Sequence, residues 1–364
     1  MAGPPPEYRI DQLTGLRTIL APARAERPLD WGTGDALETG EGAGEAAETR
    51  DDCPFCEGNE EMTPPETWAD RPGSGAPNTP GWRTRAVPNL YPALAPAQGG
   101  EGSAGAPTAA ARAPRDPLRA SARSGEADLF GSTPATGFHE VIIHSPRHRT
   151  SLAQLDDAEL RGAMAAWRTR MRELGKSASS LQLILNEGRG AGASLEHSHA
   201  QLYALDFVPV TVARERERFS AYNERTMGGD LLADIASEEV RRKERLVAID
   251  DDAIVLCPWA SRGPFEVRVV PRVAAARFES DGEVGVEALA TALRALRARL
   301  GAGLQLNAWV RTAPRGAETF HWHLDVAPKL GHKAGFELST GIDINIFPPE
   351  RAAAELREAL GPGG

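Results

Sequence analysis

Two histidines separated by one residue follow a glycine-rich run and precede a glutamine in this chain. The run from Asn186 to Gln201 reads NEGRGAGASLEHSHAQ. Alternate residues of a β-strand share one face, so His197, His199 and Gln201 are predicted to point the same way. Backbone N–H groups of a glycine-rich loop can hold phosphate, and an imidazole beside a bound phosphate is a nucleophile. The pattern therefore predicts phosphoryl or nucleotidyl transfer.

A second candidate site is the pair Cys53 and Cys56 in the sequence CPFC. Two thiolates can bind one zinc ion, which usually takes four Cys or His ligands. The chain has only three cysteines, so the other two ligands are expected to be histidines, with His148 and His197 as candidates. A redox pair or two buried thiols are the alternatives that the spacing leaves open. The turn-rich EGNE that follows favours a metal knuckle over a thioredoxin-type helix start.

Length and composition limit the class of protein. The chain has 364 residues, 41% of them hydrophobic, which is enough for two ordinary domains or one large one. Its net charge of -10 argues against a general nucleic-acid binder. The sequence shows no apolar run of about 18 residues and no signal peptide at its start, so no membrane span is expected. The few cysteines favour the reducing cytoplasm.

Two low-complexity segments interrupt the chain. Residues 32–50 are mostly Gly, Ala, Glu and Thr, and residues 95–128 are mostly Ala, Gly, Pro, Arg and Ser. Neither has the apolar content or periodicity of a core element. We expect the second segment to be a flexible surface insertion.

The ordered parts carry a duplication. Three segments recur in the same order at offsets of 127, 123 and 124 residues: 138–146 with 265–271, 181–186 with 304–307, and 197–202 with 321–326. Helix-like stretches lie between them at 156–174 and 286–300. Each half is predicted to run strand, helix, strand, loop, strand, although chance recurrence of short strand motifs is the alternative. The charged run 214–219 is interpreted as a solvated helix face.

Together the motifs resemble the galactose-1-phosphate uridylyltransferase family, the transferase branch of the histidine triad superfamily. The matching segments keep the family's order: TG at 14–15, RAERP at 24–28, CPFCEGNE at 53–60, VPNLYPAL at 87–94, HEV at 139–141, SPRH at 145–148, the run 186–201, CPWA at 257–260, PFE at 264–266 and HWH at 321–323. We therefore expect an α+β fold of two duplicated histidine-triad-like units whose antiparallel sheets join into one body. The first unit is expected over residues 1–205, with the zinc site and the catalytic histidine. A degenerate second unit over 206–364 is expected to contribute to sugar and phosphate binding.

The resemblance implies roles for individual residues. His199 matches the nucleophile that becomes uridylylated, and Gln201 matches the glutamine that bonds the transferred phosphoryl group. The implied ligands of one structural zinc are Cys53, Cys56, His148 and His197. The positions implied to line the nucleotide and its phosphates are Arg24, Arg27, Asn89, Asn186, Gly192 and Ser194. Glu337 matches a glutamate that contacts sugar hydroxyls. Family members are homodimers whose active sites borrow residues from the partner chain, which implies a homodimer here.

This sequence departs from the best-known members at three places. Ser198 stands where the family motif His-Pro-His has proline. Val310 stands where some members have an additional histidine for a second metal, so no second metal is expected. The run 335–345 keeps Glu337 without the lysine and glutamine pattern around the hexose, and it looks more like members such as plant-type ADP-glucose phosphorylase. The pair His321 and His323 is expected to be a relic of the duplication with a structural or substrate-binding role.

The leading prediction is a UDP-glucose:hexose-1-phosphate uridylyltransferase that works by a ping-pong mechanism through a uridylyl-histidine at His199. Its substrates would be a nucleotide sugar and a sugar 1-phosphate or phosphate. One alternative is an ADP-glucose phosphorylase, an adenylyltransferase or a dinucleoside polyphosphate phosphorylase that uses the same nucleotidyl-histidine. A second alternative is a non-catalytic nucleotide-binding protein that kept the fold.

Overall fold

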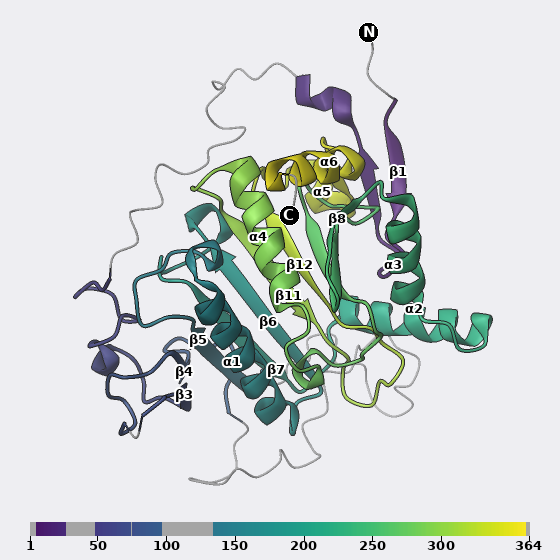
Figure 1. Ribbon diagram of the computed structural model, residues 1–364. Helices are drawn as coiled ribbons and strands as arrows, with labels where there is room; N and C mark the ends of the chain where they lie inside the picture. The colour runs from purple at the N-terminus through teal and green to yellow at the C-terminus, as the bar shows by residue number, and fades with distance from the viewer. Residues whose placement is uncertain (1–4, 27–47, 74, 97–133, 362–364) are drawn as a thin grey trace.

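A ten-stranded antiparallel sheet forms the centre of the molecule (Figure 1). The computed structural model describes residues 5–26, 48–73, 75–96 and 134–361. The predicted low-complexity segments 32–50 and 95–128 lie almost wholly outside these residues. Within the described part of the chain, no helix has the length and apolar character needed to span a membrane.

The sheet joins the two halves of the chain edge to edge. Its strand order is β3-β4-β5-β7-β6-β11-β12-β10-β9-β8. The strands of the first half are β3 (Trp68–Asp70), β4 (Thr84–Pro88), β5 (Gly137–Ile143), β6 (Ser180–Glu187) and β7 (His199–Leu205). Those of the second half are β8 (Leu246–Ile249), β9 (Ala253–Leu256), β10 (Val267–Pro271), β11 (Leu306–Arg311) and β12 (His323–Pro328). At the centre β6 pairs with β11, with Asn186 opposite Asn307. The predicted α+β class, with antiparallel sheets joined into one body, is confirmed.

The two halves repeat one connectivity. The first runs β5, α1 (Asp157–Gly175), β6, β7, and the second runs β10, α4 (Val286–Leu300), β11, β12. In the sheet these strands stand as β5-β7-β6 and, in mirrored order, as β11-β12-β10. Helix α1 begins at a capping box between Asp156 and Glu159, which satisfies two backbone N–H groups at the helix start. Both helices lie within one residue of the predicted ranges, whereas the domain boundary at 205 stays a prediction.

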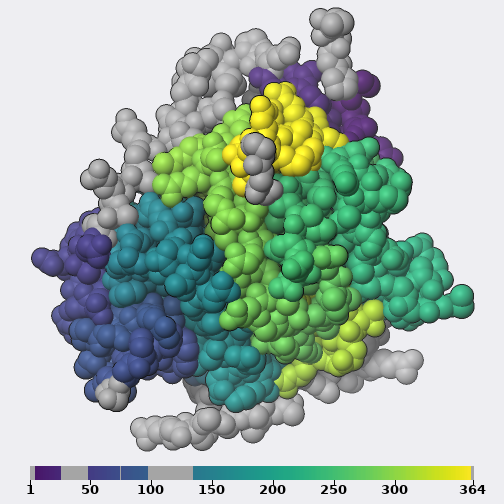
Figure 2. Space-filling model, in the orientation of Figure 1, coloured from purple at the N-terminus to yellow at the C-terminus, as the bar shows by residue number. Residues whose placement is uncertain are grey.

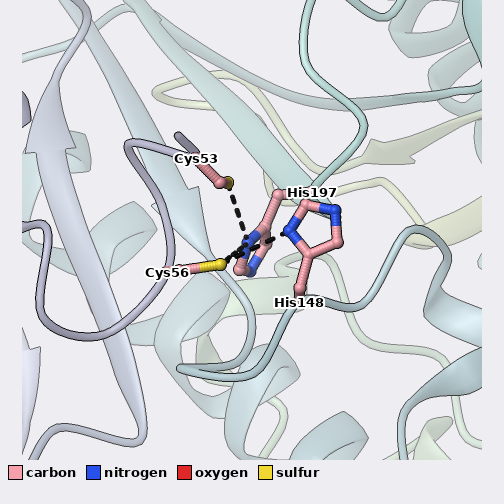
Figure 3. Close-up of side chains that lie close together, drawn as sticks. All are labelled: Cys53, Cys56, His148 and His197. Carbon is pink, nitrogen blue, oxygen red and sulfur yellow. Dashed lines mark hydrogen bonds between the residues drawn. The ribbon is translucent and has the colours of Figure 1, made fainter. Parts of the chain in front are cut away.

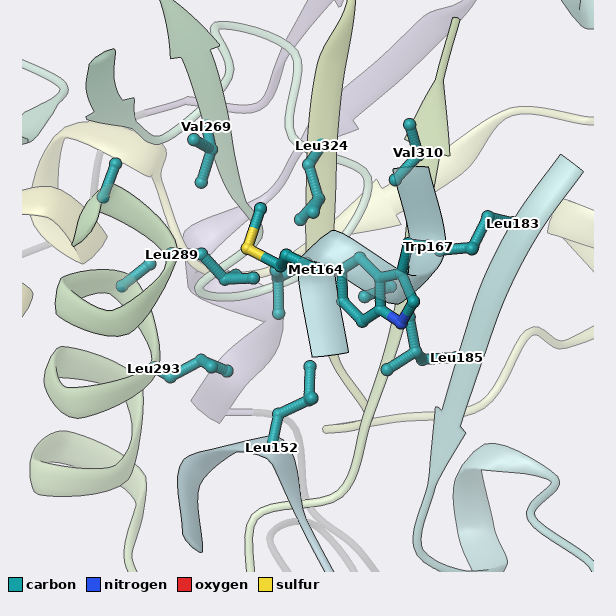
Figure 4. Close-up of a cluster of buried hydrophobic side chains, with 14 of the residues drawn as sticks. Leu152, Met164, Trp167, Leu183, Leu185, Val269, Leu289, Leu293, Val310 and Leu324 are labelled. Atoms are coloured by element: carbon teal, nitrogen blue, oxygen red, sulfur yellow. The ribbon is translucent and has the colours of Figure 1, made fainter. Parts of the chain in front are cut away.

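Helices α1 and α4 cover one face of the sheet, and the opposite face is apolar only where other helices pack on its β8–β10 end. The side chains of α1 and α4 pack on β6, β11 and β12 in a buried core that includes Trp167, Leu183, Leu185 and Leu324 (Figure 4). Each large apolar side chain removed from water contributes about 1.5–3 kcal/mol to folding. Since strand residues alternate, the neighbours of these leucines point to the opposite face. That face is where the candidate site lies.

Smaller elements surround the sheet. Strands β1 (Glu7–Ile10), β2 (Arg17–Leu20) and β13 (Asp343–Asn345) form a second, three-stranded sheet. The remaining α-helices of the described residues are α2 (Val210–Thr226), α3 (Leu231–Arg242), α5 (Gly335–Thr340) and α6 (Pro349–Leu360). The 3-10 helices are η1 (Pro22–Glu26), η2 (Glu60–Met62), η3 (Leu152–Gln154), η4 (Arg189–Ala191) and η5 (Phe278–Ser280). In the space-filling view residues 48–96 form the left edge and α2 projects at the right (Figure 2).

The interpretation of residues 214–219 as a solvated helix face is wrong at two positions. Glu215 and Phe219, both on α2, are 2% and 1% exposed. Phe219 packs on Phe320, with ring centroids 4.8 Å apart, and Glu215 lies 3.3 Å from Arg311 on β11. Burial raises the pKa of the Glu215 carboxyl to about 7. The helix presents this stripe to the sheet face opposite α1 and α4, where Phe219 joins a second apolar cluster. The charged residues around the stripe conceal it in the sequence.

Candidate active site and metal centre

Four side chains from three segments of the chain meet beside β4 (Figure 3). Cys53 and Cys56 come from the loop before η2, His148 follows β5, and His197 precedes β7. All four are buried, and their ligand atoms lie within 4.8 Å of one another. The structure therefore brings together the four residues predicted to bind zinc.

The distances in this cluster suit a tetrahedral metal site. Cys53 Sγ lies 3.5 Å and Cys56 Sγ 3.7 Å from His197 Nδ1, and Cys56 Sγ lies 3.4 Å from His148 Nδ1. Zn–S and Zn–N bonds of about 2.3 and 2.0–2.1 Å at the tetrahedral angle separate S from N by about 3.6 Å. His197 Nε2 lies 2.9 Å from the Ser145 carbonyl oxygen, which accepts its proton and leaves Nδ1 free for a metal. The donor set fits zinc.

The predicted nucleophile, His199, is the first residue of β7. Its Nδ1 lies 2.8 Å from the His197 carbonyl oxygen, which fixes the proton on Nδ1 and leaves Nε2 as the free nitrogen. Burial lowers the pKa of the imidazole, so the ring is neutral at pH 7. The Phe55 ring, carried between the two cysteines, meets the His199 ring at 5.1 Å. His197 precedes the strand, and its ring turns toward the cysteines.

Gln201 shares the open face of β7 with His199, two residues along the strand. Its Oε1 accepts from the Tyr203 hydroxyl at 3.1 Å and lies 3.1 Å from His139 Nε2. The Ala93 N–H donates to His139 Nδ1 at 3.3 Å, which leaves the imidazole proton on Nε2, facing Gln201. The His139 and Tyr203 rings stack with centroids 4.0 Å apart. These contacts leave the Gln201 amide NH2 as the group available to a substrate. The sequence did not single out His139 or Tyr203 for this role, although alternation along β5 and β7 was a signal for both.

A glycine loop links Asn186 to the two histidines. Gly188 has φ +84°, and a Cβ there would lie 2.4 Å from Gln305 Cγ, so only glycine fits. Gly192 has φ +91° at the end of η4, and Ser194 is exposed in the same loop. Asn307 Nδ2 donates to Asn186 Oδ1 and to the Ala191 carbonyl, each at 2.8 Å. Asn307, which the sequence did not single out, therefore fastens this loop to β11.

A cavity of about 530 Å³ opens beside this loop. Its lining includes Asn186 and Asn307 from the central strands and Glu337 from α5. Arg262 also lines it, with its guanidinium 4.7 Å from the centroid of the Trp309 ring. The predicted sugar contact and one predicted nucleotide contact thus share one cavity.

The remaining predicted nucleotide contacts have different surroundings. The Asn89 backbone N–H donates to the His139 carbonyl at 2.9 Å, which places Asn89 beside Gln201 and its partners. Arg24 is exposed on η1, and no described contact joins it to the His199 segment. Arg27 lies outside the described residues.

Two family models match this chain. The model "Galactose-1-phosphate uridyl transferase, N-terminal domain" matches residues 84–209. A second model, "Domain of unknown function (DUF4921)", matches residues 171–361. The galactose-1-phosphate uridylyltransferase of Haemophilus influenzae is 30% identical over 243 residues, which cover 63% of this chain and 69% of that protein.

The chain belongs to the galactose-1-phosphate uridylyltransferase family.

A second relative matches along almost the whole chain. The ADP-glucose phosphorylase of Arabidopsis thaliana is 28% identical over 363 residues, which cover 97% of this chain and 93% of that protein. The crystal structure of an Arabidopsis thaliana ADP-glucose phosphorylase with bound ADP-glucose superposes with a TM-score of 0.73 at 27% identity. The match covers 97% of this chain and 99% of that one.

In the present chain, the late histidine pair, His321 and His323, repeats the local geometry of His197 and His199. His323 Nδ1 lies 3.3 Å from the His321 carbonyl, and His321 Nε2 lies 3.1 Å from the Pro271 carbonyl. His323 Nε2 faces charged groups and lies 3.7 Å from Asp325 Oδ2. Burial, together with the nearby Arg268 and Arg311 guanidinium groups, lowers the pKa of His323 to about 3.

The environment of His323 does not suit a second cation. Val310, which the sequence analysis placed at the position of a second metal ligand, packs in the core on the helix side of the sheet. The next residue, Arg311, faces the His323 side of β11 and pairs with Glu215. A guanidinium beside the histidine repels a metal ion. Among the described residues the cluster of Cys53, Cys56, His148 and His197 is the one group with metal-binding geometry.

We expect Gln201→Glu to slow transfer by about 10²–10³-fold, the usual effect of losing one hydrogen-bond donor to a developing oxyanion. The carboxylate keeps an acceptor for His139 and Tyr203 but removes the NH2 group and adds a negative charge. Single-turnover kinetics of nucleotidyl transfer to the protein measures the effect. A variant that transfers at the parent rate would show that the Gln201 amide does not bond the phosphoryl group.

Proposed function

We propose that this protein is a nucleotide-sugar nucleotidyltransferase that carries the nucleotide on His199 between two half-reactions. The observation that supports this most directly is the fixed His199 imidazole. Its Nδ1 proton is held by the His197 carbonyl, and Nε2 is left free on the same strand face as Gln201. Glycine, asparagine and glutamine groups around it are neutral donors suited to phosphate oxygens.

In the first half-reaction His199 Nε2 attacks the α-phosphorus of the nucleotide sugar. The new P–N bond forms as the bond from phosphorus to the bridging oxygen breaks, and the sugar 1-phosphate leaves with that electron pair. The imidazole ring becomes cationic, and its Nδ1–H stays bonded to the His197 carbonyl. The Gln201 NH2 bonds a non-bridging oxygen. In the second half-reaction an oxygen of an acceptor phosphate attacks the same phosphorus. The P–N bond breaks as the new P–O bond forms, and its electron pair returns to Nε2, which restores neutral His199.

We propose that Cys53, Cys56, His148 and His197 bind one structural zinc in this enzyme. The bound metal would hold the Cys53–Cys56 loop, which carries Phe55, against the nucleophile. It would also fix the backbone whose His197 carbonyl orients His199. The zinc would act structurally, and the reacting groups in both half-reactions would be His199 and the substrate phosphates.

The preferred donor in this proposal is ADP-glucose, with phosphate as the acceptor. The likeness that supports it runs along 97% of the chain, to an ADP-glucose phosphorylase. The second candidate is the predicted uridylyl transfer between UDP-glucose and a hexose 1-phosphate. The uridylyltransferase match over residues 84–209 and the Haemophilus influenzae relative favour it.

We propose a homodimer in which Arg24, which has no described contact with the His199 segment, serves the nucleotide site of the partner chain. The nucleotide-binding role of Arg27 stays a prediction. Asn89, Asn186, Gly192 and Ser194 would line the nucleotide within the same chain, and Glu337 would contact the sugar. The cytoplasmic location stays a prediction.

Incubation with α-³²P-labelled ADP-glucose and UDP-glucose tests the proposal. We expect acid-labile, base-stable label on the protein from ADP-glucose, and its release by inorganic phosphate. Label from UDP-glucose, released by a hexose 1-phosphate, would instead support the uridylyltransferase. Tight nucleotide binding with no label from either donor would overturn the proposal and favour a non-catalytic nucleotide-binding protein.

A further inference from the structure

Ser198 lies between the metal-site residue His197 and the nucleophile His199. Its side chain is only 2% exposed and points away from the open face that His199 occupies. Its Oγ lies 3.0 Å from His144 Nδ1 and 2.9 Å from Glu187 Oε1. The hydroxyl therefore joins two buried polar side chains that the proposed reaction does not use.

The Trp167 indole N–H fixes the direction of each hydrogen bond that links His144, Ser198 and Glu187. Trp167 Nε1–H can only donate, and it lies 3.1 Å from His144 Nε2. His144 Nε2 must therefore carry a lone pair, so the His144 proton sits on Nδ1 and is donated to Ser198 Oγ. The Ser198 hydroxyl proton is then left for Glu187 Oε1. Only one arrangement of protons satisfies the chain from Trp167 to Glu187.

Glu187 closes the chain with two further donors. The Leu152 backbone N–H lies 2.6 Å from Glu187 Oε1, and Ser151 Oγ lies 2.9 Å from Oε2. Glu187 and His144 are 2% and 0% exposed. Buried polar groups of this kind stabilise one conformation strongly, because each lost partner leaves another group unpaired in a dry interior.

The chain of hydrogen bonds connects the elements that meet behind His199. Trp167 comes from α1, His144 follows β5, Ser198 precedes β7, and Glu187 ends β6. The backbone of Ser198 is held as well, since its N–H donates to the Arg149 carbonyl at 2.6 Å. The hydroxyl thus ties the single residue between the metal site and the nucleophile to the helix and to both flanking strands.

We infer that Ser198 is a positioning residue for nucleotidyl transfer: its hydroxyl, held between His144 and Glu187, fixes the backbone that aims His199 Nε2 at the substrate. This inference rests on the proposed role of His199 as nucleophile. Serine leaves φ free where the related motif has proline, which locks φ near −65°. In this chain the side-chain hydrogen bonds supply the restraint.

The test compares Ser198→Ala with the matched variant Ser151→Ala. Each change removes one hydroxyl that donates to Glu187, but Ser151 lies at η3, outside the link between the histidines. We expect Ser198→Ala to slow single-turnover formation of the nucleotidyl-enzyme by about 10–100-fold, the cost of a small misalignment. Its KM and zinc content should match the parent. Ser151→Ala should keep the parent rate, even if its thermal midpoint falls as far as that of Ser198→Ala.

A second readout does not depend on turnover. In protein labelled with ¹⁵N-histidine, we expect a slowly exchanging His144 Nδ1 proton that is lost in Ser198→Ala, together with shifted His199 nitrogen signals. If the parent forms no nucleotidyl-enzyme, the proposed function fails while these signals still test the positioning. Unchanged rate and unchanged His199 signals in Ser198→Ala would overturn the inference. Equal slowing in both variants would do so too. Ser198→Cys, with a weaker donor, should give an intermediate rate if the alanine variant does not fold.

Discussion

Replacing His199 with asparagine should remove nucleotidyl transfer while leaving the fold intact. The proposed attacking atom is His199 Nε2, and no other described imidazole presents a free nitrogen on the same strand face beside Gln201. Loss of a covalent nucleophile typically lowers kcat by roughly 10⁴- to 10⁶-fold. Asparagine keeps a polar side chain of smaller size and can still donate to the His197 carbonyl. Covalent labelling and steady-state turnover with ADP-glucose and UDP-glucose measure the effect.

His323→Asn is the matched control for this prediction. His323 bonds the His321 carbonyl through Nδ1 as His199 bonds that of His197. It differs in facing Asp325 and the arginines that pair with Asp325 and Glu215. We expect the control variant to keep covalent labelling, and the metal content of both variants to equal that of the parent. Parent-like turnover by His199→Asn, or label found on His323, would contradict the mechanism.

Local patterns in the sequence predicted the parts of the site that a single strand or loop defines. Alternation placed His199 and Gln201 on one face of β7, and the glycine run gave the loop before them. His197 was expected to point with them, but it precedes the strand and turns to Cys53 and Cys56. Strand periodicity does not extend past the residue at which the strand begins.

Local sequence patterns could not predict the contacts between segments that are far apart in the chain. Asn307 lies 121 residues from Asn186 in the sequence, and it bonds Asn186 because β6 and β11 pair in one register. Nothing in a single sequence fixes that register, since a slip of one residue would turn Asn307 to the other face. His139 reaches Gln201 in the same way, through the pairing of β5 with β7.

The charged residues of α2 also concealed the buried side of that helix in the sequence. Val212, Glu215 and Phe219 form the buried stripe of α2, at a helical spacing of three and four residues. The arginine and glutamate residues between them suggested a solvated helix, and a glutamate is rarely buried without a partner. Its partner, Arg311, is supplied by β11, so the prediction needed tertiary contacts that the segment does not encode.

Replacing Cys56 with alanine should empty the metal site and free the loop around Cys53 and Cys56 from the rest of the fold. The Cys56 thiolate is one of the four proposed ligands. Burial raises the pKa of the free thiol to about 11, so a bound cation is needed to favour the thiolate. We expect zinc content to fall from about one per chain to near zero. Covalent labelling should fall with it, because Phe55 and the His197 carbonyl would no longer hold the His199 ring.

Hydrogen exchange locates the effect and separates it from global unfolding. The apolar cluster around the metal site is small, built from Phe55, Trp82 and the ends of β4 and β5, whereas α1 and α4 belong to the large core. Loss of the metal should therefore deprotect residues 48–62 and spare both helices. Cys257→Ala is the control: this thiol is fully buried in the large core, so zinc and protection near Cys53 should match the parent. If the Cys56→Ala protein still bound one zinc per chain, Cys56 would not be needed to hold the metal. That result would refute the assignment of Cys56 as a ligand.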